Sequence, residues 1–519
     1  MLALGVESLE TVGMQGHSEP NRELLDAAAL CRQLVPEGTV EVFLADHRQE
    51  LFPDELFEDL FPSGRGRPSV PADVIASVMI LQALEGLSDR DAARALKDRI
   101  SWKVACGLAL DDPGFHHTVL TYWRCRFRAS QHPERIFDAV RDVIEATGVL
   151  KAKTRRALDS TLLDDAVATQ DTVTQLISQI RRVRRDVAAA ASVELHAHDY
   201  DAGVKPVIAW DDPVAKNQLV GALVGDALAL IEATEATELT EEQRGAVGLL
   251  ALVAGQDVEP AEEEGTWRIA HRVAPDRVIS TVDPEARHMH KSRSRYRDGY
   301  KAHIAVEPDT GIITAAALTP ANTADGPTGV ALLEGEVQGL EVTADSAYGS
   351  GEVRAGLAER SHRALIKPIP LRPAVPGGFT IDSFVIDPAA GTASCPGGVA
   401  VRISPKGNVC FGARCRGCPL RPRCTRSKDG RKIKLHPHHD LLAAARRQAQ
   451  SDEFVLSYRR HRPMVERSIA WLVARGNRKV RYRGVAKNKS GLFSRVAAIN
   501  LRRLVNLGLD YDAGWVLAT

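Results

Sequence analysis

The spacing of apolar residues predicts helices over most of residues 20–150. In "PADVIASVMILQALEGLSDRDAARALKD" apolar residues recur at helical spacing on both sides of Gly86, which ends one helix, and Ser88 can cap the next. So short a turn is typical of a DNA-binding helix-turn-helix and equally of an ordinary helical hairpin. Upstream, "GRGRP" places Arg65 and Arg67 for contacts with a phosphate backbone, or is a plain linker.

Further along the chain, alternating apolar positions predict strands. The first strand covers 155–163 and is followed by three helical segments, so residues 164–275 are interpreted as an all-helical insertion. Residues 299–319 alternate on both sides of the turn "PDTG", which predicts a β-hairpin. Short strands follow at 340–345 and 362–369, on either side of one helix.

These elements divide a chain of 519 residues, too long for one ordinary core, into several parts. No run of about 18 uncharged apolar residues occurs and the N-terminus lacks a basic n-region, so we expect no membrane span and a cytoplasmic, nucleoid-associated protein. The parts are a helical DNA-binding domain (1–150), core strands (151–163 and 276–370), a helical insertion (164–275), a cysteine-rich insertion (371–435), and a long helix with a basic C-terminal region (436–519).

Charge is distributed unevenly, although the formal net charge is zero. Residues 402–503 contain 27 Lys and Arg against 5 Asp and Glu, whereas residues 211–265 contain 2 against 13. A basic segment this rich in Leu, Val and Ile is no tail, and it indicates a polyanionic partner, nucleic acid above all. The alternative is a solvated basic surface.

Three carboxylates stand at positions suited to metal-dependent chemistry. Asp159 and Asp345 follow predicted strands, and Glu466 lies on a predicted helix, on one face with Arg459 and Arg462. Three such carboxylates can hold two Mg²⁺ ions about 3.5–4 Å apart at a phosphodiester. Glu466 among arginines is explained if a cation lies between it and DNA. The alternative is a surface ion pair between Glu466 and Arg462.

The series "ALDST", "GYKAHIAVEPDTGIITAAALTPANTADGP", "ADSAYGS" and "YRRHRPMVERSIAWL" resembles, in that order, the DDE transposases of bacterial insertion sequences. The resemblance extends over most of the chain and includes "GRPSVPADVIASVMILQALEGLSDRDA". It implies an α/β fold with an RNase H-like core and a mixed sheet, and the catalytic triad Asp159, Asp345 and Glu466. It also implies Mg²⁺, with Mn²⁺ as an alternative, and double-stranded DNA at transposon ends and target, which a homodimer cleaves and joins.

The segment around the glutamate departs from one signature of such transposases. Many relatives share Tyr-x2-Arg-x3-Glu-x6-Lys; here Arg462 and Glu466 keep the spacing, but Tyr458 lies one residue too far upstream. Val473 stands where the lysine would be, so a later arginine in "VARGNR" is expected to substitute. The residues predicted to bind DNA are Arg65, Arg67, Tyr458, Arg459, Arg462 and Arg475.

Cysteines cluster in the second insertion. Cys415, Cys418 and Cys424 have the spacing C-x2-C-x5-C, and Cys395 precedes them in "SCPGG". Four thiolates suit a closed tetrahedral Zn²⁺ site, which would supply folding energy to a segment with little apolar material. Cys410, or a histidine of "HPHH", is an alternative to Cys395, and free thiols on a loop are the alternative to a metal.

Other residues admit two interpretations. His303 is a strand histidine or lies near the scissile phosphate, and Trp471 and Tyr482 pack in the core or stack on a flipped base. For the whole chain, the predicted function is that of a transposase. The alternatives are a non-catalytic zinc-containing DNA-binding protein, such as a regulator or a decayed transposase, and a structure-specific nuclease on the same fold.

Overall fold

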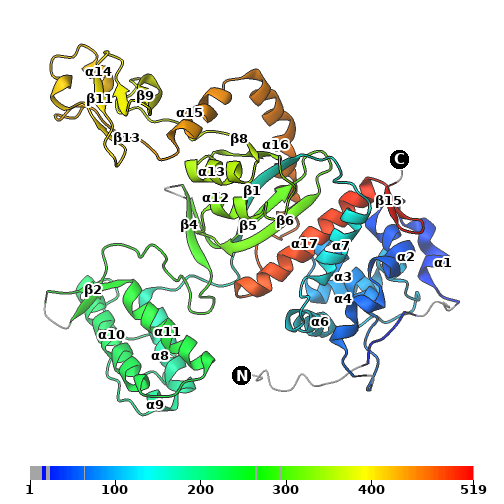
Figure 1. Ribbon diagram of the computed structural model, residues 1–519. Helices are drawn as coiled ribbons and strands as arrows, with labels where there is room; N and C mark the ends of the chain where they lie inside the picture. The colour runs from blue at the N-terminus through cyan, green and yellow to red at the C-terminus, as the bar shows by residue number, and fades with distance from the viewer. Residues whose placement is uncertain (1–13, 19–23, 64, 263–265, 293–294, 518–519) are drawn as a thin grey trace.

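A six-stranded mixed sheet lies at the centre of the molecule (Figure 1). Its middle strand, β1 (Arg155–Asp164), pairs antiparallel with β5 (Arg295–Val306) and parallel with β7 (Glu341–Ala344). The predicted hairpin at 299–319 is present, because β6 pairs antiparallel with β5, while β8 extends the parallel side beyond β7. The outer strands are β4 (Arg287–Ser292), β6 (Ile313–Pro320) and β8 (Arg363–Ile366).

This computed structural model describes residues 14–18, 24–63, 65–262, 266–292 and 295–517. The sequence prediction of an α/β fold with a mixed sheet is confirmed in this part of the chain.

Helices cover both faces of the sheet. Successive side chains of β1 point to opposite faces, so apolar residues of this strand are buried on each side. Leu158 points to one face, where it packs in a cluster with residues of α12 (Asp325–Ala331) and α13 (Gly351–Glu359). Ala157 points to the opposite face, which is covered by α16 (Asp452–Val473) and α17 (Val485–Asn506). By the same alternation Asp159 faces α16.

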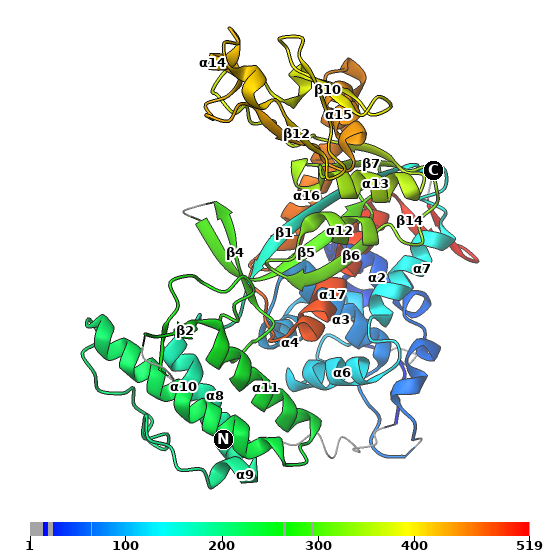
Figure 2. The same cartoon turned by 60° about the vertical axis from the view of Figure 1, so that its left-hand side comes forward.

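Most of the buried side chains of the N-terminal helices belong to a core that they share with the rest of the protein, and a smaller separate cluster joins α1, α2 and α5. The N-terminal helices pack along α17, and one continuous apolar cluster joins their side chains to α17 and to the sheet (Figures 1 and 2). These elements are α1 (Ala27–Cys31), η1 (Arg32–Leu34), α2 (Val40–Leu51), η2 (Asp54–Leu60), α3 (Ala72–Glu85), α4 (Asp89–Asp98), α5 (Ile100–Cys106), α6 (Thr118–Ala129) and α7 (Arg135–Ala146).

The predicted helix pair around Gly86 is formed by α3 and α4. Gly86 adopts the left-handed conformation with φ 68°, and the Ser88 side chain accepts a hydrogen bond from the amide of Asp91. Every residue of α3 from Ala72 to Gln82 is buried, whereas α4 buries only Ala92, Ala95 and Leu96. Both interpretations of the pair fit this geometry, because the second helix of a helix-turn-helix is the one that contacts DNA.

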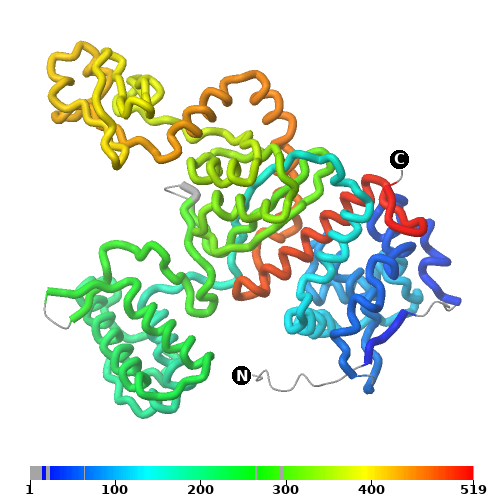
Figure 3. Tube along the Cα trace, viewed as in Figure 1, coloured from blue at the N-terminus to red at the C-terminus, as the bar shows by residue number. Residues whose placement is uncertain are grey.

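The helical insertion is a separate lobe with its own apolar cluster (Figure 3). Its long helix α10 is the one helix in the described part of the chain that is long and apolar enough to cross a membrane by length and composition. However, Leu223, Val224 and Leu230 of α10 pack inside this cluster. The insertion consists of α8 (Thr172–Asp186), α9 (Ala188–Ala191), α10 (Pro213–Glu235), α11 (Glu241–Gln256), β2 (Val258–Pro260) and β3 (Trp267–Ile269).

The cysteine-rich segment forms a second small lobe, connected to α16 by α15 (His439–Gln448) (Figure 1). Short strands surround a small cluster that includes Phe384, Phe411 and Ile433. Its elements are η4 (Ile381–Ser383), β9 (Val385–Asp387), β10 (Thr392–Ser394), β11 (Ala400–Arg402), β12 (Asn408–Cys410), η5 (Gly412–Cys415), α14 (Arg421–Cys424) and β13 (Lys432–Lys434). The remaining elements are η3 (Ser346–Tyr348), β14 (Leu509–Tyr511) and β15 (Trp515–Leu517).

Candidate active site

The three predicted catalytic carboxylates are carried by β1, by the end of β7 and by α16. Asp159 lies in the middle of β1 and not at a strand end as predicted, whereas the neighbouring β7 ends at Ala344, one residue before Asp345, as predicted. The Asp345 side chain accepts a hydrogen bond of 2.9 Å from the amide of Ala347, which fixes it at the start of η3. Glu466 lies on α16, which contacts both strands, and its side chain is 63% exposed.

Arg462 connects two of these carboxylates. Its Nη2 donates to Asp159 Oδ2 at 2.6 Å, and its Nε donates to Glu466 Oε1 at 3.4 Å. Its Nη1 donates to the carbonyl of Leu158 at 2.7 Å. The sequence predicts a DNA phosphate as the partner of Arg462; the structure instead has this side chain 8% exposed and engaged with the protein. The ion pair between Arg462 and Glu466 is present, but at the edge of the site rather than on an open surface.

The electrostatics of this site favour a bound cation. Burial raises the pKa of Asp159, the charge of Arg462 opposes that shift, and the charge of Asp345 adds to it. The two aspartates therefore repel each other when both are ionised, and a positive charge between them relieves the repulsion. Carboxylate oxygens are the ligands that Mg²⁺ and Mn²⁺ prefer, so the donor set fits these ions.

In this structure, however, the site has the geometry of an ion-pair network. Within the described residues, no three His, Cys, Asp or Glu side chains are grouped closely enough to hold a metal ion. The guanidinium group of Arg462 supplies the positive charge between Asp159 and Glu466 instead.

A buried polar network that the sequence interpretation missed lies beside Asp159. Ser160 donates to Asp325 Oδ1 at 2.8 Å, and Lys301 Nζ lies 3.1 Å from the same oxygen. Tyr348 shares a hydrogen bond with Ser160, and its pKa is raised by burial and by the charges of Asp325 and Asp159. Two features of the sequence could have pointed to this network: a lysine inside an apolar strand and the aspartate of "ANTADGP". Their spacing along the chain does not connect either of them to the triad.

His303 belongs to the same network. It is fully buried, and its Nε2 shares a 2.9 Å hydrogen bond with Thr319 Oγ1 of the neighbouring strand. Burial lowers its pKa to about 4, so the ring is neutral at physiological pH. These contacts match the structural interpretation of His303 rather than a role at the scissile phosphate.

A pocket of about 790 Å³ lies beside the triad. It is lined by Tyr458, Arg459 and Arg462 of α16, and by Lys367 after β8. The Tyr458 ring stacks on Phe454 with an interplanar angle of 15°, and Lys367 Nζ lies 5.4 Å from the Tyr458 ring centroid. An aromatic face with cations around it is suited to a nucleotide strand.

The other predicted DNA contacts are spread over the surface. Arg65 and Arg67 are exposed on the loop before α3, and no hydrogen bond or ion pair in the described residues links either to the triad. Arg475 is exposed on the loop after α16, with a positive φ of 55°. Trp471 packs under the guanidinium groups of Arg502 and Arg503, as the core interpretation expects.

The four predicted zinc ligands line one cavity of about 280 Å³ in the cysteine-rich lobe. Burial raises the pKa of Cys424, and the charges of Cys415, Cys395 and Cys418 add to the shift, so the four thiols are neighbours. They are not drawn together into a metal site, and all are free thiols. Cys410 is exposed on β12, outside the residues lining the cavity.

The histidines of "HPHH" lie away from these thiols. His436 Nε2 lies 3.0 Å from Glu352 Oε1, on the side of the catalytic core.

Two family models match the chain. The model described as "Transposase DDE domain" matches residues 395–505, and the model described as "Transposase domain (DUF772)" matches residues 31–126. These two matches support a DDE transposase of the insertion-sequence type. No curated protein and no solved structure matches it.

The matched segments cover only part of the site of this transposase. The first includes the four clustered cysteines, Glu466 and most of α17, and the second includes the α3–α4 pair. Asp159 and Asp345 lie outside both segments. Members of this family act on DNA and use divalent metal ions.

Proposed function

We propose that this transposase binds the ends of an insertion sequence, cleaves a phosphodiester there and joins the freed 3′-hydroxyl to target DNA. The observation that carries the proposal is that the buried Arg462 bonds both Asp159 and Glu466, while the charge of Asp345 acts on Asp159 from the end of the neighbouring strand. Pairing of the first strand with β5 and β7 at the centre of that sheet supports an RNase H-like core.

The same three carboxylates would hold two Mg²⁺ ions, or Mn²⁺. When bound, such a pair activates the attacking oxygen and stabilises the leaving oxygen of a phosphodiester. Arg462 holds the Asp159 carboxylate toward α16 while no such ion is bound. Tyr458, Arg459 and Lys367 position the DNA strand in the adjoining pocket.

The test is metal-dependent cleavage of duplex DNA carrying the ends of the element. Asp159→Asn, Asp345→Asn and Glu466→Gln should each lower the cleavage rate by several orders of magnitude, and the losses should not add, because the three residues act as one unit. DNA binding should persist. Glu453→Gln is the matched control: it removes an exposed carboxylate from the same helix and should leave cleavage unchanged. Normal cleavage by Glu466→Gln would remove Glu466 from the site.

A non-catalytic DNA-binding protein is the competing function. It is favoured by the basic 402–503 segment alone, and it predicts DNA binding with no Mg²⁺-dependent cleavage by any variant. A structure-specific nuclease on the same core would cleave but would not join the 3′-hydroxyl to a second duplex. Strand transfer is expected from a homodimer, because two ends must be held together, and it takes place in the cytoplasm, where the chromosome lies.

We also propose a structural Zn²⁺ bound by Cys395, Cys415, Cys418 and Cys424. The support is a set of four thiols around one cavity, in a lobe whose apolar cluster is small. Freshly reduced protein should contain about one zinc per chain, and Cys418→Ser should expose the lobe to protease while the sheet stays folded. Cys410→Ser is the control and should keep the metal. Metal analysis without zinc would exclude the proposal.

A further inference from the structure

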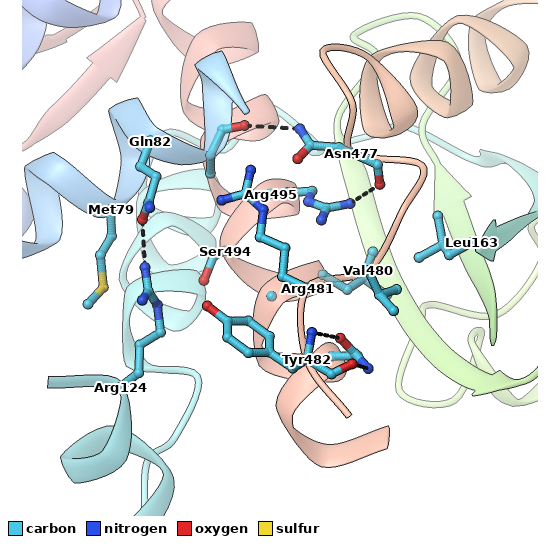
Figure 4. Close-up of a pocket in the computed structure, with 14 residues that line it drawn as sticks. Met79, Gln82, Arg124, Leu163, Asn477, Val480, Arg481, Tyr482, Ser494 and Arg495 are labelled. Atoms are coloured by element: carbon cyan, nitrogen blue, oxygen red, sulfur yellow. Dashed lines mark hydrogen bonds between the residues drawn. The ribbon is translucent and has the colours of Figure 1, made fainter. Parts of the chain in front are cut away.

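A second charged pocket lies away from the triad, where the N-terminal helices meet the loop at 474–484 and α17 (Figure 4). Leu163, near the end of β1, is among the residues that line it, and its volume is about 60 Å³. Side chains from three parts of the chain converge on it, as the close-up shows. The polar ones that carry the argument are Gln82, Arg124, Asn477, Arg481, Tyr482 and Arg495.

The three arginines differ in how their charges are balanced. Arg124 is neutralised by Asp89, whose Oδ2 accepts at 2.8 Å, and Arg124 also donates to Gln82. Arg481 donates to the carbonyls of Gly86 and Leu87, the negative end of α3. Within the described part of the chain, no carboxylate forms an ion pair with Arg481.

Arg495 is the least compensated of the three. Its Nη1 donates to the carbonyl of Asn477 at 2.6 Å, and within the described residues this is its one hydrogen bond, with no carboxylate as an ion-pair partner. Burial, with the neighbouring charge of Arg481, lowers the pKa of Arg495 to about 10. The group is still charged at neutral pH, and a charge removed from water without a partner is costly.

The structure therefore offers two neighbouring guanidinium groups with unused donors and, among the described residues, no carboxylate at ion-pair distance, although the charges of Asp89 and Asp91 act on Arg481 from farther away. A role in holding the fold together accounts for Arg481, which caps α3, but not for a second arginine brought against it. We propose that this pocket binds one phosphate group of the DNA backbone, with Arg495 and Arg481 as its donors. The inference rests on the proposed function as a DNA-joining enzyme, because it takes DNA as the source of the phosphate.

The size of the pocket determines which part of DNA it can take. At about 60 Å³ the pocket is far smaller than the pocket of about 790 Å³ beside the triad, which suits a small anionic group such as a phosphate. Tyr482 is one of the residues that line this pocket. The Asn488 side chain accepts a hydrogen bond from the amide of Tyr482 and donates one to its carbonyl, which fixes the backbone from which the ring extends.

The location relates the pocket to the reaction. Leu163 is four residues beyond Asp159 on the same strand, a separation of roughly 13 Å along β1. The loop at 474–484 is anchored to β1 by Arg478, which donates to the carbonyl of Leu162. A phosphate held here would fix the DNA a few nucleotides from the scissile bond, and would tie the N-terminal helices to the catalytic strand.

The experiment compares Arg495→Gln and Arg495→Lys with Arg141→Gln, an exposed arginine on α7 paired with Asp138, in the full chain. DNA affinity is measured by fluorescence anisotropy on a short duplex of arbitrary sequence over a series of KCl concentrations. Losing one phosphate contact should reduce the slope of log K against log salt by about 0.9 in Arg495→Gln. Arg495→Lys should retain most of the slope, and Arg141→Gln all of it.

The second arm uses inorganic phosphate as the probe. Sodium phosphate, compared with chloride at equal ionic strength, should raise the unfolding temperature of wild type and Arg141→Gln, but not of Arg495→Gln. An unchanged salt slope in a folded Arg495→Gln that still cleaves DNA would overturn the proposed DNA contact and leave the proposed function standing. A phosphate shift without a change in slope would assign the pocket to free phosphate instead of DNA.

The two arms also separate the two proposals. If wild-type protein neither binds nor cleaves DNA, the proposed function fails, and a phosphate shift that depends on Arg495 still identifies an anion pocket. If Arg495→Gln unfolds in all buffers, Arg481→Gln decides, because Arg481 is the second proposed donor: a reduced slope supports the phosphate contact, and an unchanged slope overturns it.

Discussion

Two helical regions of this transposase look alike in sequence and differ in how they are held. The N-terminal helices share one apolar cluster with α17 and the sheet, whereas the helices of the insertion enclose a cluster of their own. The insertion leaves and rejoins the core at one point, because the amide of Gln170 donates to the carbonyl of Ile279 at 2.8 Å. The first region is therefore part of the catalytic body, and the second is an appended unit.

The difference follows from how apolar residues are distributed around the helices. In α3 apolar residues occur on all sides, and a helix of this kind must be surrounded by protein. In α8 the buried positions Val173, Leu176, Ile180 and Val183 form one stripe, which two partner helices suffice to cover. The first pattern demands a large core, and the catalytic domain supplies it through α17.

Removing each region whole gives the largest expected contrast. Replacing residues 171–278 by a short Gly/Ser linker should leave a chain that unfolds cooperatively, because the two junctions are already adjacent. A chain that begins at residue 151 should not fold, because the apolar surfaces of α17 and the sheet lose their cover. Circular dichroism melts and limited proteolysis measure both. Cooperative unfolding of the chain that begins at residue 151, or a stable fragment 1–150, would contradict the shared core.

A buried ion pair provides the next contrast. Arg48 and Asp73 pair at 2.9 Å with side chains 4% and 3% exposed, so Asp73→Asn should cost the main unfolding transition about 3–5 kcal/mol. In the insertion, Asp226 accepts from two backbone amides and from the Tyr200 hydroxyl. Asp226→Asn should cost about 1–3 kcal/mol there and leave the main transition in place. Scanning calorimetry distinguishes the unfolding of the insertion from the main transition. A single transition shifted by both variants would refute the claim that the two regions unfold separately.

The sequence alone predicted the helices and strands better than the side-chain contacts between them. The strand with Asp159, the hairpin after residue 299 and the end of the strand at Asp345 follow from local alternation and from a turn. The burial of Arg462 could not be predicted in this way, since it depends on how α16 crosses β1. The same holds for Lys301 and Asp325, which meet only because β5 and α12 pack together.

Acid provides a contrast of intermediate size. His303 sits in the shared body with a pKa of about 4, below its ordinary 6.5, so the unfolded chain binds more protons than the folded one between these values. Stability of the main transition should therefore fall as pH decreases from 6.5 to 4, by up to about 3 kcal/mol from this group. His303→Gln should weaken the pH dependence of the free energy of unfolding for the main transition, and it should leave the transition of the insertion unchanged.

Wild type must be compared with His303→Gln because Asp165 changes the stability with pH in the direction opposite to His303. Burial raises its pKa to about 6, so the folded chain binds more protons over part of the same range. Denaturant titrations of wild type and His303→Gln at a series of pH values cancel that contribution. Identical pH slopes in the two proteins would show that His303 is not held neutral in the fold.

Two helix caps give the smallest effect. Ser88 caps α4 in the shared body, and Thr240 caps α11 in the insertion, and each hydroxyl accepts from a backbone amide three residues on. Replacing either by alanine should cost about 1 kcal/mol. The same free energy should lower the melting temperature of the insertion, with its small unfolding entropy, by about 4–8 °C, and that of the larger body by less than about 4 °C. Calorimetry of Ser88→Ala and Thr240→Ala measures this; equal shifts in one common transition would mean that the two helical regions unfold as a single unit.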